Sequence, residues 1–118
     1  MPELNDHQAE ARRIVQIYVD DVRSGRKAEE WIAPTWRESY TRGKVGSGMR
    51  ELLRTARKVT VGEAVPPQGL RLGLFMDVRL YIDHERWELR VIREAAPDKT
   101  DPEAPYGIIP TSLRMTRP

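Results

Sequence analysis

Apolar residues alternate with other residues along the segment GLRLGLFMDVRLYID, residues 69–83. Leucine, methionine, valine or isoleucine occupies every second position from Leu70 to Ile82. A period of two predicts a β-strand with one buried face. We therefore predict a long central strand here, with the rest of the chain either pairing with it or covering its apolar side.

The N-terminal half of the chain has helical spacing instead. A first helix is expected from about residue 6 to Arg23, ended by Ser24 and Gly25, because a glycine suits the left-handed position after a helix. Its apolar residues recur at the spacing of one buried stripe. They are Ala11, Ile14, Val15, Tyr18 and Val22.

Two shorter helices are expected next. The first covers about residues 27–33 and is stopped by Pro34. The second covers about residues 48–57, with Ser47 as its cap, and the preceding TRGKVGSG is interpreted as a loop.

From Lys58 the period changes to two, and three further strands are expected. Val59, Val61 and Val65 indicate a first strand, ended by the turn at 66–69. RWELRVIRE returns antiparallel to the central strand after a four-residue loop, Asp83–Arg86. This loop pairs Ile82 with Trp87, Leu80 with Leu89, and Val78 with Val91.

The last part of the chain is expected to contain a connection and one more strand. Residues 95–105 are rich in proline and charge and predict a flexible connection. A last strand follows over 106–115, with Ile109, Leu113 and Met115 facing inward. Pro110 indicates an edge strand or an irregularity at that point.

These elements predict one α+β domain over residues 1–118. Helices at about 6–57 pack on one face of a curved, cone-like sheet of four antiparallel strands at about 58–116. The length of 118 residues suffices for a core without disulfides, and the sequence has no cysteine. No apolar stretch approaches the roughly 20 residues of a membrane span. The chain is therefore expected to be cytoplasmic.

Charge argues against nucleic acid as the partner. The formal net charge is +2, from 20 basic and 18 acidic residues mixed along the chain. Nucleic-acid binding requires a concentrated basic patch. The arginines of the sheet could still serve it, and such binding would weaken steeply with salt.

The order of elements resembles the nuclear transport factor two-like superfamily of α+β cones. The resemblance rests on IVQIYVDDVRSG, KAEEWIA, GSGMRELL leading into KVTVGEA, and the hairpin ending in RWELRVIRE. The end of the chain, RWELRVIRE followed by PYGIIPTSLRM, is similar to assembly factors of bacterial type IV secretion and conjugation machines. The resemblance implies helices on the concave side of a bent sheet, and dimers formed sheet to sheet.

The predicted inner face of the sheet carries no group that can transfer a proton. It consists of leucine, methionine, valine and isoleucine on the central strand, and of Trp87, Leu89 and Val91 on the next. We therefore predict no catalytic residues, no cofactor and no metal site. The alternative is an enzyme or a small-molecule carrier that uses the interior of the cone. If the faces were exchanged, Asp77 and Tyr81 would lie inside and could act as acid and base.

Histidine does not change this expectation. His84 lies between two acidic residues in a hairpin turn, where adjacent side chains rarely converge on one ion. His7 is expected to be exposed in the first helical turn. Together they lack the spacing of a zinc site.

The outer face of the sheet is predicted to be the binding surface. It mixes arginine with aromatic and aliphatic residues, which suits a homodimer or another protein partner. The interface residues are Arg71, Phe75, Arg79, Tyr81, Arg90 and Ile92. A secondary contact is expected at Trp31, Trp36, Arg37 and Tyr40. The predicted register places Arg79 opposite Arg90, an unfavourable pair without an acidic neighbour.

Overall fold

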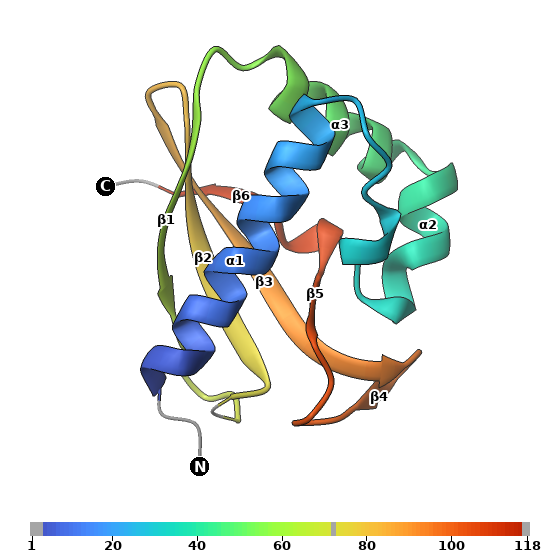
Figure 1. The fold of residues 1–118 in the computed structure, drawn as a ribbon, viewed down its shortest axis with the longest axis vertical. Coiled ribbons are helices and arrows are strands. Elements are labelled where there is room, and N and C mark those ends of the chain that lie inside the picture. The colour runs from blue at the N-terminus through green and yellow to red at the C-terminus, as the bar shows by residue number, and fades with distance from the viewer. Residues whose placement is uncertain (1–3, 72, 117–118) are drawn as a thin grey trace.

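The computed structural model describes residues 4–71 and 73–116. Its helices are α1 (Leu4–Arg23), α2 (Arg37–Arg42) and α3 (Lys44–Thr55), with 3-10 turns at Glu29–Trp31, Pro34–Trp36 and Pro110–Ser112. Its strands are β1 (Val59–Val65), β2 (Phe75–Ile82), β3 (Glu85–Ala96), β4 (Lys99–Thr100), β5 (Tyr106–Ile108) and β6 (Arg114–Thr116). The helices pack with a curled antiparallel sheet, so the predicted α+β class is confirmed (Figure 1).

The sheet is organised around β2 and β3. β2 pairs with β1 on one edge and with β3 on the other. The far edge of β3 pairs first with β6 and then with β5, and β4 forms a short hairpin with the end of β3. The predicted last strand is thus divided in two by the 3-10 turn that begins at Pro110, the position at which proline indicated an irregularity.

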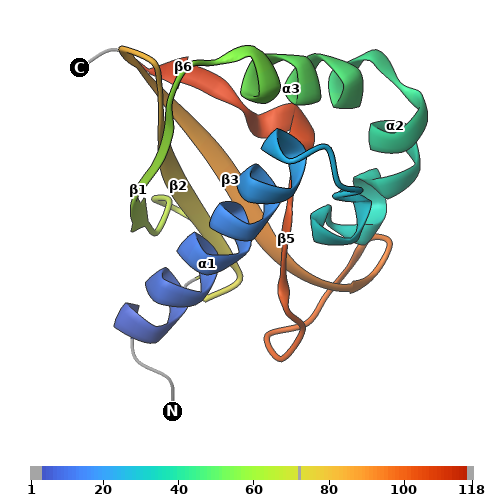
Figure 2. The ribbon, with the colours of Figure 1, turned by 45° about the horizontal axis from the view of Figure 1, so that its top comes forward.

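The core lies between α1 and the concave face of the sheet (Figure 1). All five residues of the predicted α1 stripe are buried, and Val19 joins them. The inward side chains of β2 and β3 that meet them are fully buried, each contributing about 1.5–3 kcal/mol on transfer from water. These residues are Met76, Val78, Leu80, Leu89 and Val91. Figure 2 shows α3 across the end of α1, where it also contacts the 3-10 turn Pro110–Ser112.

The helix expected at 27–33 is only a 3-10 turn, Glu29–Trp31. The chain then becomes extended, and Ile32 forms a parallel bridge with Ile108 of β5. The Ala33 amide donates to the Ile108 carbonyl oxygen at 2.9 Å. Because these groups complete the edge of the sheet, tertiary pairing replaces the helix that the local sequence favours.

α3 begins at Lys44, four residues earlier than the predicted start at Gly48. Ser47 is inside the helix, and its hydroxyl donates to the Lys44 carbonyl oxygen instead of capping. Gly46 is buried, and a Cβ there would lie 1.8 Å from the Tyr40 carbonyl oxygen. The glycines that indicated a loop therefore include one that lets α2 and α3 approach closely.

β2 begins at Phe75, later than the predicted start at Gly69. Gly73 has φ +87°, a left-handed conformation that interrupts an extended strand. A Cβ at Gly73 would also lie 3.3 Å from Nε2 of His7, at the start of α1. Leu70 is exposed, while Leu74 is buried just ahead of the strand; Leu72 lies outside the described residues.

The hairpin between β2 and β3 turns at Asp83 and His84, so the predicted four-residue loop is wrong. Ile82 pairs with Glu85, and Trp87 lies opposite Leu80 instead of Ile82, a shift of two residues. Asp83 has φ +55°, and its Oδ1 accepts from the amides of Arg57 and Lys58. Because the shift is even, the predicted buried face is kept.

Residues 95–105 do not form a plain connection. β3 continues to Ala96 and turns back into β4, with Asp98 at φ +59°. The buried carboxylate of Glu94 stabilises this turn, since it accepts from the amides of Thr35 and Asp98 and from the Thr35 hydroxyl. Among the residues predicted to face inward on the last strand, Ile109 is buried but Met115 is 53% exposed.

Candidate functional site

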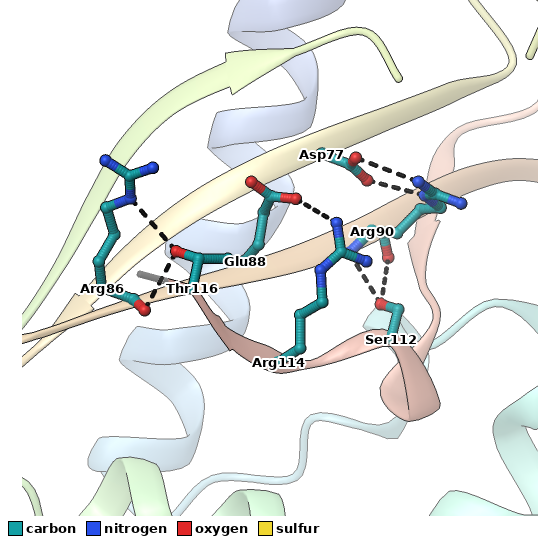
Figure 3. Close-up of polar contacts among 7 residues, drawn as sticks. All are labelled: Asp77, Arg86, Glu88, Arg90, Ser112, Arg114 and Thr116. Atoms are coloured by element: carbon teal, nitrogen blue, oxygen red, sulfur yellow. Dashed lines mark hydrogen bonds and ion pairs between the residues drawn. The ribbon is translucent and has the colours of Figure 1, made fainter. Parts of the chain in front are cut away.

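The convex side of the sheet, here called the outer face, carries the predicted interface. Register places on it the side chains that alternate with the core residues. They are Thr60 and Val65 of β1, Phe75, Asp77, Arg79 and Tyr81 of β2, and Arg86, Glu88, Arg90 and Ile92 of β3. Glu63 of β1 joins them through its ion pair with Arg79. Figure 3 shows part of this face, with a helix behind the strands.

The best-formed contact of the outer face joins Asp77 and Arg90, which lie directly opposite each other. The Arg90 guanidinium donates from Nε and Nη2 to the two carboxylate oxygens, at 2.8 and 3.1 Å (Figure 3). Asp77 is buried. Its hydrogen bonds raise the pKa of Arg90 above the ordinary value, against the opposing effect of burial. The pair is therefore a fixed, neutral unit of the surface.

Two further ion pairs lie on either side. Arg114 of β6 donates to Glu88 at 2.5 Å, and Arg79 donates to Glu63 of β1. At the end of the face, the Arg86 Nε donates to the Thr116 hydroxyl at 3.2 Å (Figure 3). The outer face is thus crossed by paired charges contributed by β1, β2, β3 and β6.

The predicted opposition of Arg79 and Arg90 is wrong. Arg79 lies opposite Glu88, and Arg90 lies opposite Asp77. The tighter turn at Asp83 moves every cross-strand pair by two positions, which replaces a like-charge pair with two opposite-charge pairs. Opposite charges across an antiparallel pair are favourable. No external anion is therefore required to neutralise these arginines.

The six predicted interface residues do not form one continuous patch. Arg79, Tyr81 and Arg90 lie on the open part of the outer face. Ile92 is 5% exposed and packs with Ala33 and Ile109, with half-buried Phe75 and Trp36 against them. Arg71 is exposed in the connection between β1 and β2.

The predicted secondary contact also separates into different environments. Tyr40 is buried in the core, where its hydroxyl lies 2.9 Å from that of Tyr18, so it is not a surface residue. Trp31 is half-buried and donates from Nε1 to Asp21 at 2.8 Å. Trp36 packs against the main core and against the small cluster of Ala33, Ile92 and Ile109. Arg37 is exposed and donates to the Ile32 carbonyl oxygen.

A buried polar cluster at the N-terminal end of α1 was not predicted. Arg93 continues the inward alternation of β3 beyond Val91 and is 6% exposed. Its Nη2 donates to Glu10 at 2.6 Å and lies 3.2 Å from Nδ1 of His7. The guanidinium also lies 3.9 Å from the centre of the Tyr106 ring. His7, Glu10, Arg93 and Tyr106 are called the Arg93 cluster below.

The donors of Arg93 are used within the protein. Besides Glu10 and His7, Arg93 donates to the carbonyl oxygens of Gly73 and Ala104. Burial by itself lowers the pKa of Arg93, but the hydrogen bond to Glu10, together with the charge interactions with Tyr106 and Glu10, outweighs it, so the pKa is raised. Burial also raises the pKa of Tyr106. The cluster therefore connects α1, β3 and β5 through buried polar contacts. Counting the alternation of β3 two residues further would have found Arg93.

Three of the groups considered for acid-base or metal chemistry lie outside the core. Asp77 and Tyr81 are on the outer face, and His84 is in the exposed hairpin turn. His7 belongs to the Arg93 cluster and is half-buried, which corrects the expectation that it is exposed. Within residues 4–71 and 73–116, no three histidine, aspartate or glutamate side chains are grouped so that they could hold a metal ion.

Comparisons against protein-family models, curated proteins and solved structures found no match to this chain. The resemblance to the nuclear transport factor two-like superfamily and to secretion assembly factors therefore stays a prediction. None of the helices in the described part of the chain has the length and apolar character needed to cross a membrane.

Proposed function

We propose that this protein is a non-catalytic binding module that forms a homodimer through the outer face of its sheet, with the cytoplasm as its expected compartment. The observation that carries the proposal is that exposed apolar residues lie beside neutralised charges on that face. Tyr81 is 38% exposed and Val65 is 40% exposed, and the Arg79–Glu63 pair lies between them. Exposed aromatic residues beside arginine are typical of protein interfaces.

The ion pairs make this face suitable for contact with a second copy. A two-fold interface brings the same patch of both chains together, so a face with a large net charge would repel itself. Here Asp77–Arg90, Glu63–Arg79 and Glu88–Arg114 each combine one acidic and one basic group. Such pairs are already oriented, which reduces the side-chain entropy lost when a partner covers them.

The packing of the inward side chains supports a non-catalytic role over the alternative of an enzyme or small-molecule carrier. The inward side chains of β2 and β3 are packed against α1. The polar groups at the N-terminal end of α1 belong to the Arg93 cluster and hydrogen-bond to each other and to carbonyl oxygens. Proton transfer in an enzyme requires such a group to contact the substrate, whereas these groups contact one another.

The mass in solution tests the proposal. Light scattering of the wild-type protein is expected to give twice the chain mass of 13.6 kDa. Tyr81→Glu and Arg79→Glu are each expected to give the monomer mass. The first replaces an exposed aromatic ring of the outer face with a carboxylate, and the second places a third carboxylate beside Glu63 and Glu88. Arg54→Glu, which changes an exposed residue of α3, is the control and is expected to remain dimeric.

Two results would count against the homodimer. One is a monomeric wild type, and the other is a dimer that survives both outer-face substitutions. Circular dichroism of each variant separates dissociation from unfolding. Tyr81→Glu is the more informative variant, because Tyr81 has no ion pair to lose, whereas Arg79→Glu also breaks the contact with Glu63.

A further inference from the structure

β1 forms the end of the sheet, and its second edge is unpaired among the described strands. The direction of its backbone groups follows from the register. Val59 lies opposite Ile82, and the Asp83 amide donates to the Lys58 carbonyl oxygen at 2.9 Å. In an antiparallel ladder this pattern turns the groups of Thr60 toward β2. The amide and carbonyl groups of Val59 and Val61 therefore point outward, away from the sheet.

The open part of this edge is short. Beyond Val61 the ladder has an irregularity, and pairing with β2 resumes at Ala64. There the Gln8 side chain of α1 donates to the Ala64 carbonyl oxygen at 2.8 Å, which covers that end of the edge. The sequence from Val59 to Val61 contains none of the lysine or proline residues that commonly protect edge strands. A partner strand can therefore form a short ladder with residues 59–61.

A groove of about 260 Å³ runs beside this edge, between β1 and α1. It is lined by Val61 of β1 and by Ala9, Arg12, Arg13 and Gln16 of α1. Arg12 and Arg13 are exposed, and within the described part of the chain neither forms an ion pair. The groove therefore places two unneutralised positive charges next to unpaired strand groups.

We propose that an extended acidic segment of a partner protein adds to the edge of β1 at residues 59–61. Its backbone pairs with the outward groups of Val59 and Val61, and its carboxylates face Arg12 and Arg13. Strand addition supplies affinity through the main chain, and side-chain contacts supply selectivity. Charge argues against a second copy at this edge, because pairing two β1 strands in one continuous sheet brings two Arg12–Arg13 sets together. The inference is independent of the proposed homodimer, which uses the outer face.

The test uses a short fluorescein-labelled peptide of alternating glutamate and valine, followed by fluorescence anisotropy with the full chain. Two further peptides separate the two parts of the proposal. In one, lysine replaces glutamate; in the other, alternate backbone nitrogens along one edge are methylated. The unmodified acidic peptide is expected to bind, and both modified peptides are expected to bind at least about tenfold more weakly.

Variants of the protein locate the binding. Arg12→Glu combined with Arg13→Glu is expected to weaken binding about tenfold or more. Lys44→Glu combined with Arg54→Glu makes the same charge change on exposed residues of α3 and is expected to have little effect. Amide resonances of Val59 and Val61 are expected to shift on binding. Equal binding of the acidic and lysine peptides, equal binding of the methylated peptide, or no binding of the acidic peptide would each overturn the proposal.

Discussion

Replacement of Arg93 by methionine is expected to be among the most damaging single changes in this protein. The side chain is 7% exposed, and it donates to a carboxylate and to two carbonyl oxygens. Methionine fills a similar volume but donates nothing. The substitution therefore leaves the acceptors of a buried arginine without their donor, while largely avoiding a cavity.

The size of the stability loss depends on how far each acceptor of Arg93 keeps or regains another hydrogen-bond donor. The Gly73 carbonyl oxygen keeps the Tyr106 hydroxyl as a donor at 2.9 Å, so its loss is small. The Ala104 carbonyl oxygen loses the short 2.7 Å bond from Arg93. The Glu10 side chain is 31% exposed and regains part of its hydration. Breaking a buried ion pair costs about 3–5 kcal/mol, so we expect about 3 kcal/mol at this partly hydrated site.

Urea unfolding measures this cost as a change in the free energy of unfolding. For a domain of this size, a loss of about 3 kcal/mol lowers Tm by roughly 12 °C. Glu10→Gln is the matched partner variant. The loss of stability in the double variant should be smaller than the sum of the two single losses by about 1–2 kcal/mol, because neither residue then leaves the other's charge unpaired. A cost below about 1 kcal/mol for Arg93→Met, or strict additivity with Glu10→Gln, would refute the argument.

Two further predictions concern close backbone packing and acid sensitivity. Gly107→Ala is expected to lose about 1–3 kcal/mol of stability, because its Cβ would lie 2.6 Å from the Ala33 Cα. Gly48→Ala is the control and is expected to gain up to about 1 kcal/mol, because its Cβ would meet nothing within 4 Å. A Gly107→Ala protein as stable as wild type in urea would contradict this. The hydrogen bond from Trp31, with that from Arg26, lowers the pKa of the Asp21 carboxyl in the folded protein. Ionised Asp21 therefore stabilises the folded state fully above the unfolded pKa of this carboxyl, and the stabilisation is lost as pH falls through the lowered folded pKa. The difference in unfolding free energy between wild type and Asp21→Asn should therefore shrink between neutral pH and about pH 3, and a constant difference would contradict this sign.

The sequence by itself determined the elements whose pattern is local and regular. The α1 stripe, β1 and the buried face of the β2–β3 hairpin all follow from apolar periodicity, because one side of each element must leave water. The buried face was predicted correctly even though the register was wrong by two residues. A shift of two residues leaves the same side chains on the buried face, so the apolar pattern cannot distinguish the predicted register from the observed one.

Tertiary structure decided the features that depend on partners distant in sequence. Ile32 and Ala33 leave their expected helix because β5 offers them a bridge and a carbonyl acceptor. Position 46 of α3 requires glycine because the Tyr40 carbonyl oxygen approaches too closely for any Cβ.

The same is true of the candidate sites. Arg79 lies opposite Glu88 only once the turn at Asp83 sets the β2–β3 register, and that turn is held by amides of residues 57 and 58. The ion pair of Arg79 with Glu63 depends instead on the pairing of β1 with β2. Arg93 meets Glu10 across most of the chain's length. Spacing along the sequence reports which face a residue occupies, whereas charge pairing depends on which strand or helix lies opposite, and that is fixed only when the sheet curls around α1.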